Sequence, residues 1–196
     1  ETAPRILEDH YSLLDGLVLG GMAITLLNHA DRVKLACLAQ LVNVIAPIFT
    51  EPGKGAYRQT IYWPFHDVSV FGRGTVLTPV VKTPQKTTKK YGDVPAVIFS
   101  AVYDESSEEV TVFALNTDKK EEADTEFNLA SFGKAEMFYR TEMTGKDLSA
   151  KNSLETPDAV MSRPAPLVQG ENGIYMVRLA PASWNVLRYR VSKQVQ

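Results

Sequence analysis

The strongest hydrophobic pattern lies in residues 13–30, where apolar residues occupy almost every side of an expected helix. Its main interruptions are Asp15, Thr25 and Asn28. Ser12 and Asp15 can each accept a hydrogen bond from an unpaired amide of a first helical turn, so the helix is predicted to begin beside them. Because apolar residues leave no continuous polar face, we expect this helix to be covered on more than one side.

A shorter, nearly continuous apolar run at residues 33–41 is typical of a strand buried on both faces, as in a parallel sheet. A helix of this length is the competing interpretation. A helix, a tight turn and a buried strand make one αβ step of an α/β architecture. Prolines and glycines in residues 42–57 predict a long loop, and residues 58–71 predict a second helix, bent or interrupted at Pro64.

The pattern changes after residues 72–74, where short β-rich runs separated by turn residues begin. The predicted strands are residues 75–81, 96–103, 110–116, 125–129, 135–142, 174–179 and 184–191. Seven short strands without a convincing amphipathic helix favour an antiparallel β-sandwich or jelly roll. We therefore expect an α/β part at residues 1–73 and an all-β domain at residues 74–196.

Composition and charge exclude several classes of protein. The chain of 196 residues is 44% hydrophobic and 22% charged, with a formal net charge of -2, which is typical of a soluble globular protein. It has no long basic stripe, so we expect no nucleic-acid partner. Its longest uncharged apolar stretch, residues 16–27, is too short to span a bilayer, so no membrane partner is expected. The chain begins with Glu1, without a Met or a signal sequence, and we do not expect Glu1 to be the start of the gene product.

Cysteine and histidine positions predict neither a disulfide nor a metal site. Cys37 is the only cysteine, which indicates a reducing compartment and hence the cytoplasm. It lies in an apolar run, so we expect a buried structural thiol. His10, His29 and His66 are not spaced with acidic residues or Cys37 as metal ligands are. No metal and no cofactor are therefore predicted.

A long motif points to a known family. Residues 30–48 read Ala-Asp-Arg-Val-Lys-Leu-Ala-Cys-Leu-Ala-Gln-Leu-Val-Asn-Val-Ile-Ala-Pro-Ile. This run resembles the segment around the eighth barrel strand of family-51 α-L-arabinofuranosidases. The resemblance continues at residues 50–51, 58–65 and 182–186, and the opening residues 4–11 resemble the segment before the seventh barrel helix. Residues 83–170 resemble the family only in the rhythm of their strands.

The resemblance implies a retaining, exo-acting hydrolase that removes terminal α-L-arabinofuranosyl groups from arabinoxylan, arabinan or their oligosaccharides. Its fold would be the last αβ portion of a (β/α)8 barrel followed by a jelly-roll-like sandwich. Retention needs two carboxyl groups about 5 Å apart, one as nucleophile and one as acid/base. In the family both are glutamates at the ends of the fourth and seventh barrel strands, which would precede this chain. We therefore expect no catalytic residue within it.

One substrate-binding residue carries over from the family. Gln40 stands at the C-terminal end of the expected eighth strand, the end that faces the substrate in a (β/α)8 barrel. The matching glutamine of the family hydrogen-bonds the arabinofuranose ring, and an amide can both donate to and accept from sugar hydroxyls. Asn43 is a weaker candidate. Tyr62 and Trp63 could offer aromatic surface near a sugar, although packing is an equally good interpretation.

Two hypotheses of different classes follow. In the first, the chain is part of an arabinofuranosidase whose N-terminal barrel segment belongs to the same gene product or to a separate chain; an isolated piece would be inactive. It predicts an exposed apolar surface along the first 70 residues. The resemblance further implies a homo-oligomer. In the second, the chain is a non-catalytic carbohydrate-binding or interaction sandwich with a row of exposed aromatics, for which the candidates are Tyr103, Phe113, Tyr139 and Tyr175.

Overall fold

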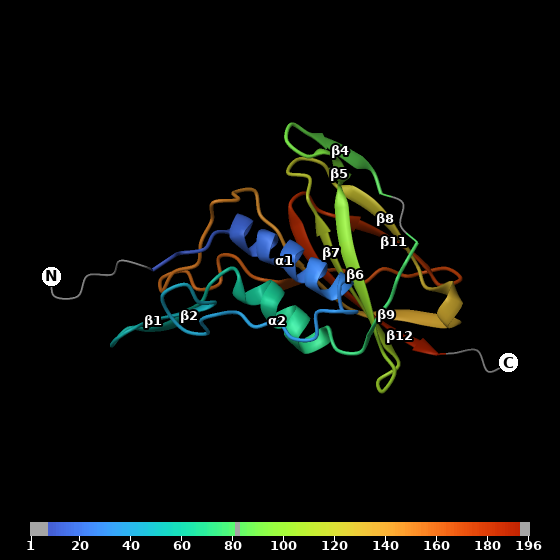
Figure 1. Cartoon of the computed structure of the whole chain (residues 1–196), viewed down its shortest axis with the longest axis horizontal. Coiled ribbons are helices and arrows are strands. Elements are labelled where there is room, and N and C mark those ends of the chain that lie inside the picture. Colours follow the sequence, from blue (N-terminus) through green and yellow to red (C-terminus); the bar gives the residue numbers. More distant parts are fainter. Residues whose placement is uncertain (1–7, 81–82, 193–196) are drawn as a thin grey trace.

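The computed structural model describes residues 8–80 and 83–192, with two α-helices lying along one face of an antiparallel sheet (Figure 1). The helices are α1 (Leu13–Asn28) and α2 (Tyr62–Phe71), and a short 3-10 helix, η1, spans Ala130–Phe132. Glu1 and residues 4–7 of the opening match lie outside the described residues.

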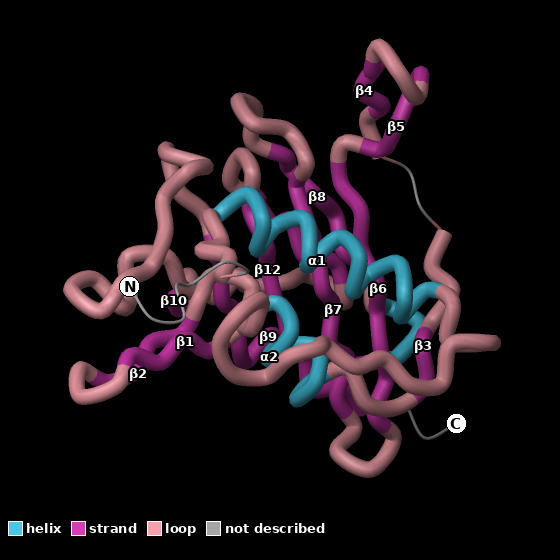
Figure 2. Tube along the Cα trace, turned by 60° about the vertical axis from the view of Figure 1, so that its left-hand side comes forward, coloured by secondary structure: helices cyan, strands magenta, loops and turns pink. Residues whose placement is uncertain are grey.

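The main sheet has six strands, all paired antiparallel, in the spatial order β10-β9-β12-β7-β6-β3. Their bounds are β3 (Thr75–Val76), β6 (Val97–Asp104), β7 (Glu109–Asn116), β9 (Lys134–Met143), β10 (Arg163–Pro164) and β12 (Ser183–Ser192). A two-stranded sheet, β8 (Ala123–Asn128) with β11 (Ile174–Leu179), packs on the face opposite the helices. Two hairpins extend from this body: β1 (Ile48–Glu51) with β2 (Gly55–Arg58), and β4 (Gln85–Thr88) with β5 (Gly92–Pro95) (Figure 2).

The six-stranded sheet is buried on both faces because its central strands alternate between two hydrophobic clusters. In β7, Val112 and Ala114 face the β8–β11 sheet, whereas Phe113 and Leu115 face the helices. Such a strand needs apolar residues at consecutive positions, which explains the continuous apolar run of β7. The sheet is therefore the central layer of three, with helices on one side and two strands on the other.

Helix α1 begins where the sequence predicts. The Asp15 carboxylate accepts from the Ser12 amide at 2.8 Å, and the Ser12 hydroxyl accepts from the Asp15 amide, which makes a capping box. Gly20 lets the helix lie directly on Trp184, because a Cβ at this position would come within 2.6 Å of the indole ring. The close approach fixes α1 on the centre of the sheet.

The predicted strand at residues 33–41 is not formed in this chain. The segment is irregular and mostly exposed, with the Leu35 side chain 83% exposed. A strand buried on both faces needs a neighbour on each side to pair its backbone. Within the described part of the chain, no strand lies beside residues 33–41. The helix that is the competing interpretation of this run is not formed either.

The two predictions for residues 42–71 also need correction. The expected loop at residues 42–57 contains the β1–β2 hairpin, whose turn uses Gly53 with φ of 75°. The second helix starts at Tyr62 and is not interrupted by Pro64, which lies in its first turn. A first-turn residue has no intrahelical partner for its amide, so proline fits there.

The sandwich strands agree closely with prediction. The run 174–179 is β11 as observed, and the runs 96–103, 110–116, 125–129, 135–142 and 184–191 match β6, β7, β8, β9 and β12 with ends that differ by one or two residues. The run 75–81 was too long, because only Thr75 and Val76 form β3, and Val81 lies outside the described residues. Strands β4, β5 and β10 were not predicted.

Candidate functional site

Gln40, the predicted substrate-binding residue, lies in the irregular segment between α1 and β1. Its side chain is exposed, and it lines none of the cavities described below. Two residues later, Val42 forms a parallel bridge with Ile48, the first residue of β1. Gln40 therefore lies two residues before the bridge that joins this segment to the first strand of the β1–β2 hairpin.

Asn43 holds the base of this hairpin. Its side-chain oxygen accepts from the Thr50 amide at 2.6 Å, and its side-chain nitrogen donates to the Thr50 hydroxyl at 2.8 Å. Its φ of 61° falls in the left-handed region, which asparagine tolerates better than most residues. Both ends of the amide have partners within the protein, so the contacts of Asn43 are structural.

Gln59, directly after the β1–β2 hairpin, joins that hairpin to the segment before α1. The Gln59 side-chain oxygen accepts from the Tyr11 amide at 2.9 Å, and the Gln59 side-chain nitrogen donates to the carbonyls of Asp9 at 3.1 Å and Ala46 at 2.9 Å. The Gln59 side chain is buried, and its bond to the Ala46 carbonyl is fully shielded from water. Gln59 lies in one of the runs that carry the family resemblance. It holds together the end of the β1–β2 hairpin, the segment before α1 and the segment before β1.

Tyr62 and Trp63, the two aromatic candidates, pack inside the molecule. The Trp63 side chain is buried, and its indole N–H donates to the Val160 carbonyl at 3.1 Å. The half-buried Tyr62 ring stacks on His66, and the Arg58 guanidinium lies 4.9 Å from the Trp63 ring centroid. Packing is the role that these contacts support.

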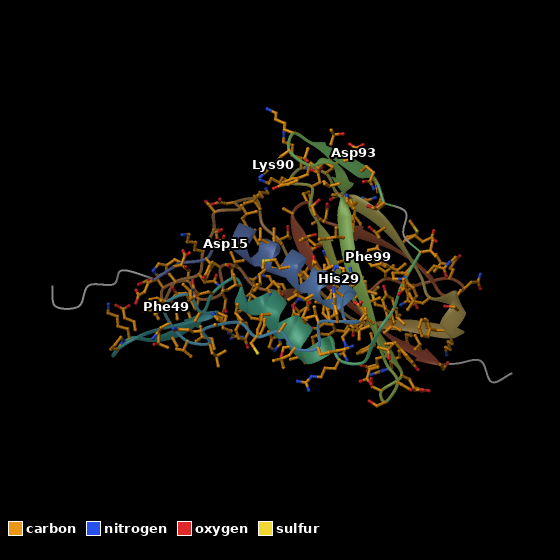
Figure 3. All side chains as sticks on the ribbon, viewed as in Figure 1. Asp15, His29, Phe49, Lys90, Asp93 and Phe99 are labelled. Carbon is orange, nitrogen blue, oxygen red and sulfur yellow. The ribbon has the colours of Figure 1, made fainter. Side chains whose placement is uncertain are left out.

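A cavity of about 510 Å³ lies between the β1–β2 hairpin and the loop at residues 151–156. We call it the hairpin cavity; it is lined by His10, Phe49, Glu51, Tyr57 and residues 151–156. Figure 3 marks Phe49 within the hairpin. The three rings form a continuous cluster, because the centroids of His10 and Phe49 are 5.0 Å apart and those of Phe49 and Tyr57 are 5.3 Å apart. Sequence reasoning missed this cavity because it treated residues 42–57 as a loop.

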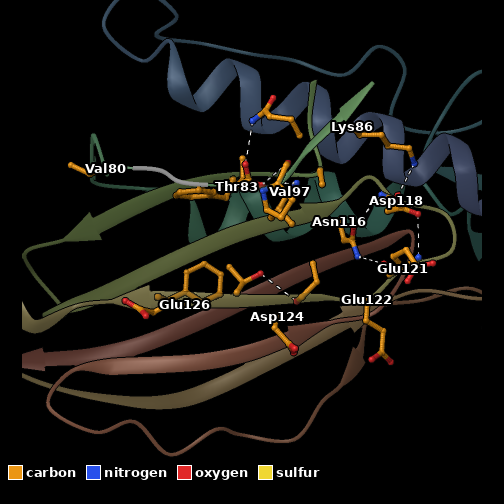
Figure 4. Close-up of a pocket in the computed structure, with 17 residues that line it drawn as sticks. Val80, Thr83, Lys86, Val97, Asn116, Asp118, Glu121, Glu122, Asp124 and Glu126 are labelled. Atoms are coloured by element: carbon orange, nitrogen blue, oxygen red, sulfur yellow. Dashed lines mark hydrogen bonds and ion pairs between the residues drawn. The ribbon is translucent and has the colours of Figure 1, made fainter. Parts of the chain in front are cut away.

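A second cavity of about 410 Å³ lies between the β4–β5 hairpin and the edges of β6 and β8 (Figure 4). Carboxylates surround it, but two of them are already paired: Asp118 with Lys86 at 2.9 Å and Asp124 with Arg178 at 2.7 Å. The Lys86 hydrogen bond, followed by the amides of residues 120 and 121, lowers the pKa of Asp118 to about 2. The first pair fastens the β4–β5 hairpin to the segment after β7, and the second links β8 to β11.

A buried carboxylate links α2 to the sandwich. Asp67 accepts from the Trp184 indole N–H at 3.0 Å and from the Ser162 hydroxyl at 3.3 Å, and the His66 ring nitrogen lies 3.2 Å from its other oxygen. Burial raises the pKa of Asp67 above its ordinary value, because these hydrogen bonds compensate only part of the lost hydration. The sequence offered no signal for this residue, since two of its partners, Ser162 and Trp184, come from distant segments.

The outer face of α1 is apolar and exposed. Leu14, Val18, Met22 and Leu26 follow one another at four-residue spacing, and Val18 and Met22 are 55% and 58% exposed. Residues at this spacing share one side of a helix. Beyond the helix, Leu35, Leu41 and other large apolar side chains of the segment are also exposed. The predicted apolar surface along the first 70 residues is therefore present.

Cys37 and the possible metal ligands are the remaining candidates from the sequence. Cys37 is exposed, so the expectation of a buried thiol is wrong; the strand that would have buried it does not form. Among the described residues, no three His, Cys, Asp or Glu side chains are grouped to hold a metal ion. Neither helix of residues 8–80 and 83–192 is long and apolar enough to cross a membrane.

Comparison with known proteins identifies relatives along almost the whole chain. An intracellular exo-α-(1→5)-L-arabinofuranosidase of Streptomyces lividans is 42% identical over 186 residues, which cover 95% of this chain and 28% of that protein. The corresponding enzyme 1 of Bacillus subtilis is 41% identical over 189 residues, covering 96% of this chain and 37% of the relative. The chain thus spans roughly a third of the length of these relatives.

Solved structures share the same fold. A family 51 α-L-arabinofuranosidase from Bifidobacterium longum superposes with a TM-score of 0.87 at 33% identity, over 95% of this chain and 36% of that one. An α-L-arabinofuranosidase from Thermotoga maritima, 24% identical, has the same fold with a TM-score of 0.78 over 96% of this chain and 40% of its own. The model of the α-L-arabinofuranosidase C-terminal domain family matches residues 1–183. The chain therefore belongs to the family of α-L-arabinofuranosidase C-terminal domains.

Proposed function

We propose that this chain is the C-terminal part of a retaining, exo-acting α-L-arabinofuranosidase. The whole enzyme would remove terminal α-L-arabinofuranosyl groups from arabinan, arabinoxylan and arabino-oligosaccharides. Residues 1–73 would complete a (β/α)8 barrel, supplying its seventh helix, eighth strand and eighth helix. Residues 74–196 would form the sandwich domain. The relatives named as exo-α-L-arabinofuranosidases support this assignment of activity.

The exposed apolar face of α1 is the observation that carries the proposal. Large exposed apolar patches mark surfaces that are covered by another protein segment. Next to it lies the segment 33–41, whose apolar sequence suits a parallel strand but which has no neighbour to pair with among the described residues. Both features are accounted for together if preceding barrel strands pack on α1 and pair with residues 33–41. The N-terminal barrel segment would thus be the main partner of this chain.

In such an assembly the roles divide between the two parts. The barrel segment would supply both catalytic glutamates, and this chain would supply Gln40 at the end of the eighth strand. The Gln40 amide would hydrogen-bond the terminal arabinofuranosyl ring and hold it for attack. Acid/base and nucleophilic catalysis by two carboxyl groups needs no cofactor.

We further propose that the enzyme is cytoplasmic and forms a homo-oligomer. The names of several relatives describe them as intracellular, which supports the first statement. The second rests on the family resemblance alone.

The alternative, a non-catalytic carbohydrate-binding sandwich, has weaker support. It requires a row of exposed aromatic side chains, but Phe113 and Tyr175 are buried in the two hydrophobic clusters. Tyr103 and Tyr139 pack against the same clusters and are partly buried. These four rings stabilise the sandwich.

The test compares the isolated chain with the full-length gene product. Only the longer protein should release 4-nitrophenol from 4-nitrophenyl α-L-arabinofuranoside. In the longer protein, Gln40→Ala should lower kcat/KM by about tenfold or more, because a substrate hydrogen bond is lost. Gln169→Ala, an exposed glutamine of the sandwich, is the matched control and should leave kcat/KM unchanged. Hydrolysis by the isolated chain, or full activity of Gln40→Ala, would contradict the proposal.

A further inference from the structure

The β4–β5 hairpin, residues 85–95, extends from the body of the protein, and we call it the β4–β5 arm (Figure 2). Its base is held by the ion pair of Lys86 with Asp118, 2.9 Å apart. Its tip, Lys89-Lys90-Tyr91, is exposed, and Tyr91 is 71% exposed. A two-stranded hairpin is only marginally stable in water by itself, so the tip gains stability from a surface that covers it.

The β8–β11 sheet has an outward face, because its strands alternate between buried and exposed residues. Phe127, Tyr175 and Val177 point into the sandwich core. Glu122, directly before β8, belongs to the outward face, since it lies 3.6 Å from Arg178. Three carboxylates and one guanidinium give this face a formal charge of -2, beside two apolar side chains. Its exposed residues, which we call the outer patch, are Glu122, Asp124, Glu126, Ile174, Met176 and Arg178.

The tip of the arm complements the outer patch in charge and in polarity. Lys89 and Lys90 bring two positive charges to a surface with a formal charge of -2. Tyr91 can pack on Met176, which is 56% exposed and pairs with Glu126 across the sheet. Tyrosine and methionine are enriched in protein interfaces, and opposite charges around them fix the partner and its register. The arm and the patch therefore suit each other as two halves of one contact.

The positions of the two surfaces select a second copy of this chain as the partner. A two-fold interface uses the same surface on both subunits, so the inserting element and its receiving patch must adjoin on each subunit. The arm and β8 do adjoin, because both line the cavity of about 410 Å³ in Figure 4. Within one copy the tip remains exposed while Lys86 fixes the base. A two-fold rotation would lay each arm on the outer patch of the other copy and make the contact twice.

We propose that the β4–β5 arm binds the outer patch of a second copy of this chain and so forms a two-fold interface between two full-length enzymes. This inference rests on the homo-oligomer of the proposed function and assigns a surface to it. The interface lies on the β8–β11 side of the central sheet, whereas α1 lies on the other side. The second copy and the barrel segment would therefore bind different faces of the sandwich.

The experiment measures the mass of the full-length enzyme by sedimentation velocity over a range of protein concentrations. Lys89→Glu with Lys90→Glu should raise the concentration needed for self-association by about tenfold or more, because attraction to the outer patch becomes repulsion at both contacts. Glu122→Lys with Glu126→Lys should have the same effect. Both variants should keep the wild-type kcat/KM for 4-nitrophenyl α-L-arabinofuranoside, which shows that they are folded.

Mixing the two variants distinguishes a direct contact from an indirect effect. An equal mixture should associate again, because the acidic arm of one variant meets the basic patch of the other, and the second contact is that of the wild type. The matched control, Lys134→Glu with Lys146→Glu, reverses exposed charges outside the arm and the outer patch and should associate like the wild type.

Each outcome bears on the interface separately from the activity. Loss of association in both variants with recovery on mixing supports the interface. Unchanged association in the variants, or no recovery on mixing, overturns it. A lower melting temperature of Glu122→Lys with Glu126→Lys at unchanged mass also overturns it, because a segment of the same chain would then cover the outer patch. A monomeric wild type overturns the interface and the homo-oligomer, whereas hydrolysis of the arabinofuranoside by the same sample leaves the proposed activity standing.

Discussion

At the scale of single residues, Trp184 is the point where helices and sandwich meet. Its ring is fully buried, stacks on Phe113 with centroids 5.8 Å apart and contacts Gly20 of α1, while its N–H donates to Asp67 of α2. The sequence predicts Trp184 as a core residue of the closing strand, and this is confirmed. Its two helix contacts could not be predicted, because they join positions more than 100 residues apart.

The first prediction concerns the glycine beneath α1. Gly20→Ala should destabilise the protein by about 1–3 kcal/mol, because its Cβ would overlap an indole ring that cannot move away. The neighbouring Gly21→Ala is the control: its Cβ would meet only the Leu115 methyl at 3.3 Å and the Ile98 methyl at 3.6 Å. Alanine also favours the helix, so Gly21→Ala should stay within about 1 kcal/mol of wild type. Urea denaturation of both variants measures the difference, and equal effects would contradict the packing argument.

The second prediction concerns the pH dependence contributed by Asp67. Because burial raises its folded pKa above 3.8, the folded protein binds this proton more tightly than the unfolded chain. The contribution is therefore complete below pH 3.8 and is lost as the pH rises through the folded pKa. Asp67→Asn cannot titrate and should be less stable at low pH, with a gap to wild type that shrinks as the pH rises.

Unfolding midpoints of wild type and Asp67→Asn between about pH 4 and 6 measure this gap. A gap that stays constant or widens with pH would contradict the assignment. Gln169→Ala, at an exposed residue without a titratable side chain, serves as the control and should give a difference from wild type that is nearly independent of pH.

At the scale of elements, α1 has two apolar faces with different surroundings. One face, with Leu17, Gly20 and Ile24, is buried on the six-stranded sheet. The opposite face, with Val18 and Met22, is exposed. The pattern of residues 13–30 predicts a helix covered on more than one side, and in the structure the six-stranded sheet covers one side. Under the proposed function, the barrel segment covers the other side.

The third prediction separates the two faces of α1. Val18→Glu with Met22→Lys, an oppositely charged pair one helical turn apart, should raise the solubility of the isolated chain without reducing its helix content. In the full-length protein the same pair should lower the melting temperature by several degrees, because charges would be buried under the barrel segment. Val80→Glu, at an apolar residue 96% exposed outside α1, is the control and should leave the melting temperature unchanged. An unchanged full-length protein after the α1 substitutions would mean that this face remains exposed.

At the scale of the whole molecule, the chain spans only a third or so of its relatives, and its segments differ in how fully they are covered. The central sheet is covered on both faces, by β8 and β11 on one side and by α1 and α2 on the other. The segment between α1 and β1 lacks neighbours among the described residues and exposes large apolar side chains. A barrel cannot close with its last strand alone, since each strand pairs with two others.

The fourth prediction follows from this difference. The protein purified from its native source should have an intact mass well above 21.7 kDa, or should copurify with a second chain that carries the remaining barrel strands. Intact mass spectrometry combined with native size determination measures both quantities. A single 21.7 kDa species that is soluble and carries no partner would contradict the proposed assembly.

The sequence by itself determined the sandwich, the start of α1 and the family, because each depends on local signals: short β-rich runs such as those of β6 and β7, the Ser12–Asp15 capping box and a continuous motif at residues 30–48. Only the tertiary structure decided that residues 33–41 stay irregular in this chain and that Cys37 is exposed. The physical reason is that a buried strand is stabilised by its neighbours and not by its own residues. For the same reason the hairpin cavity and the Asp67–Trp184 contact, built from distant segments, were visible only after folding had brought those segments together.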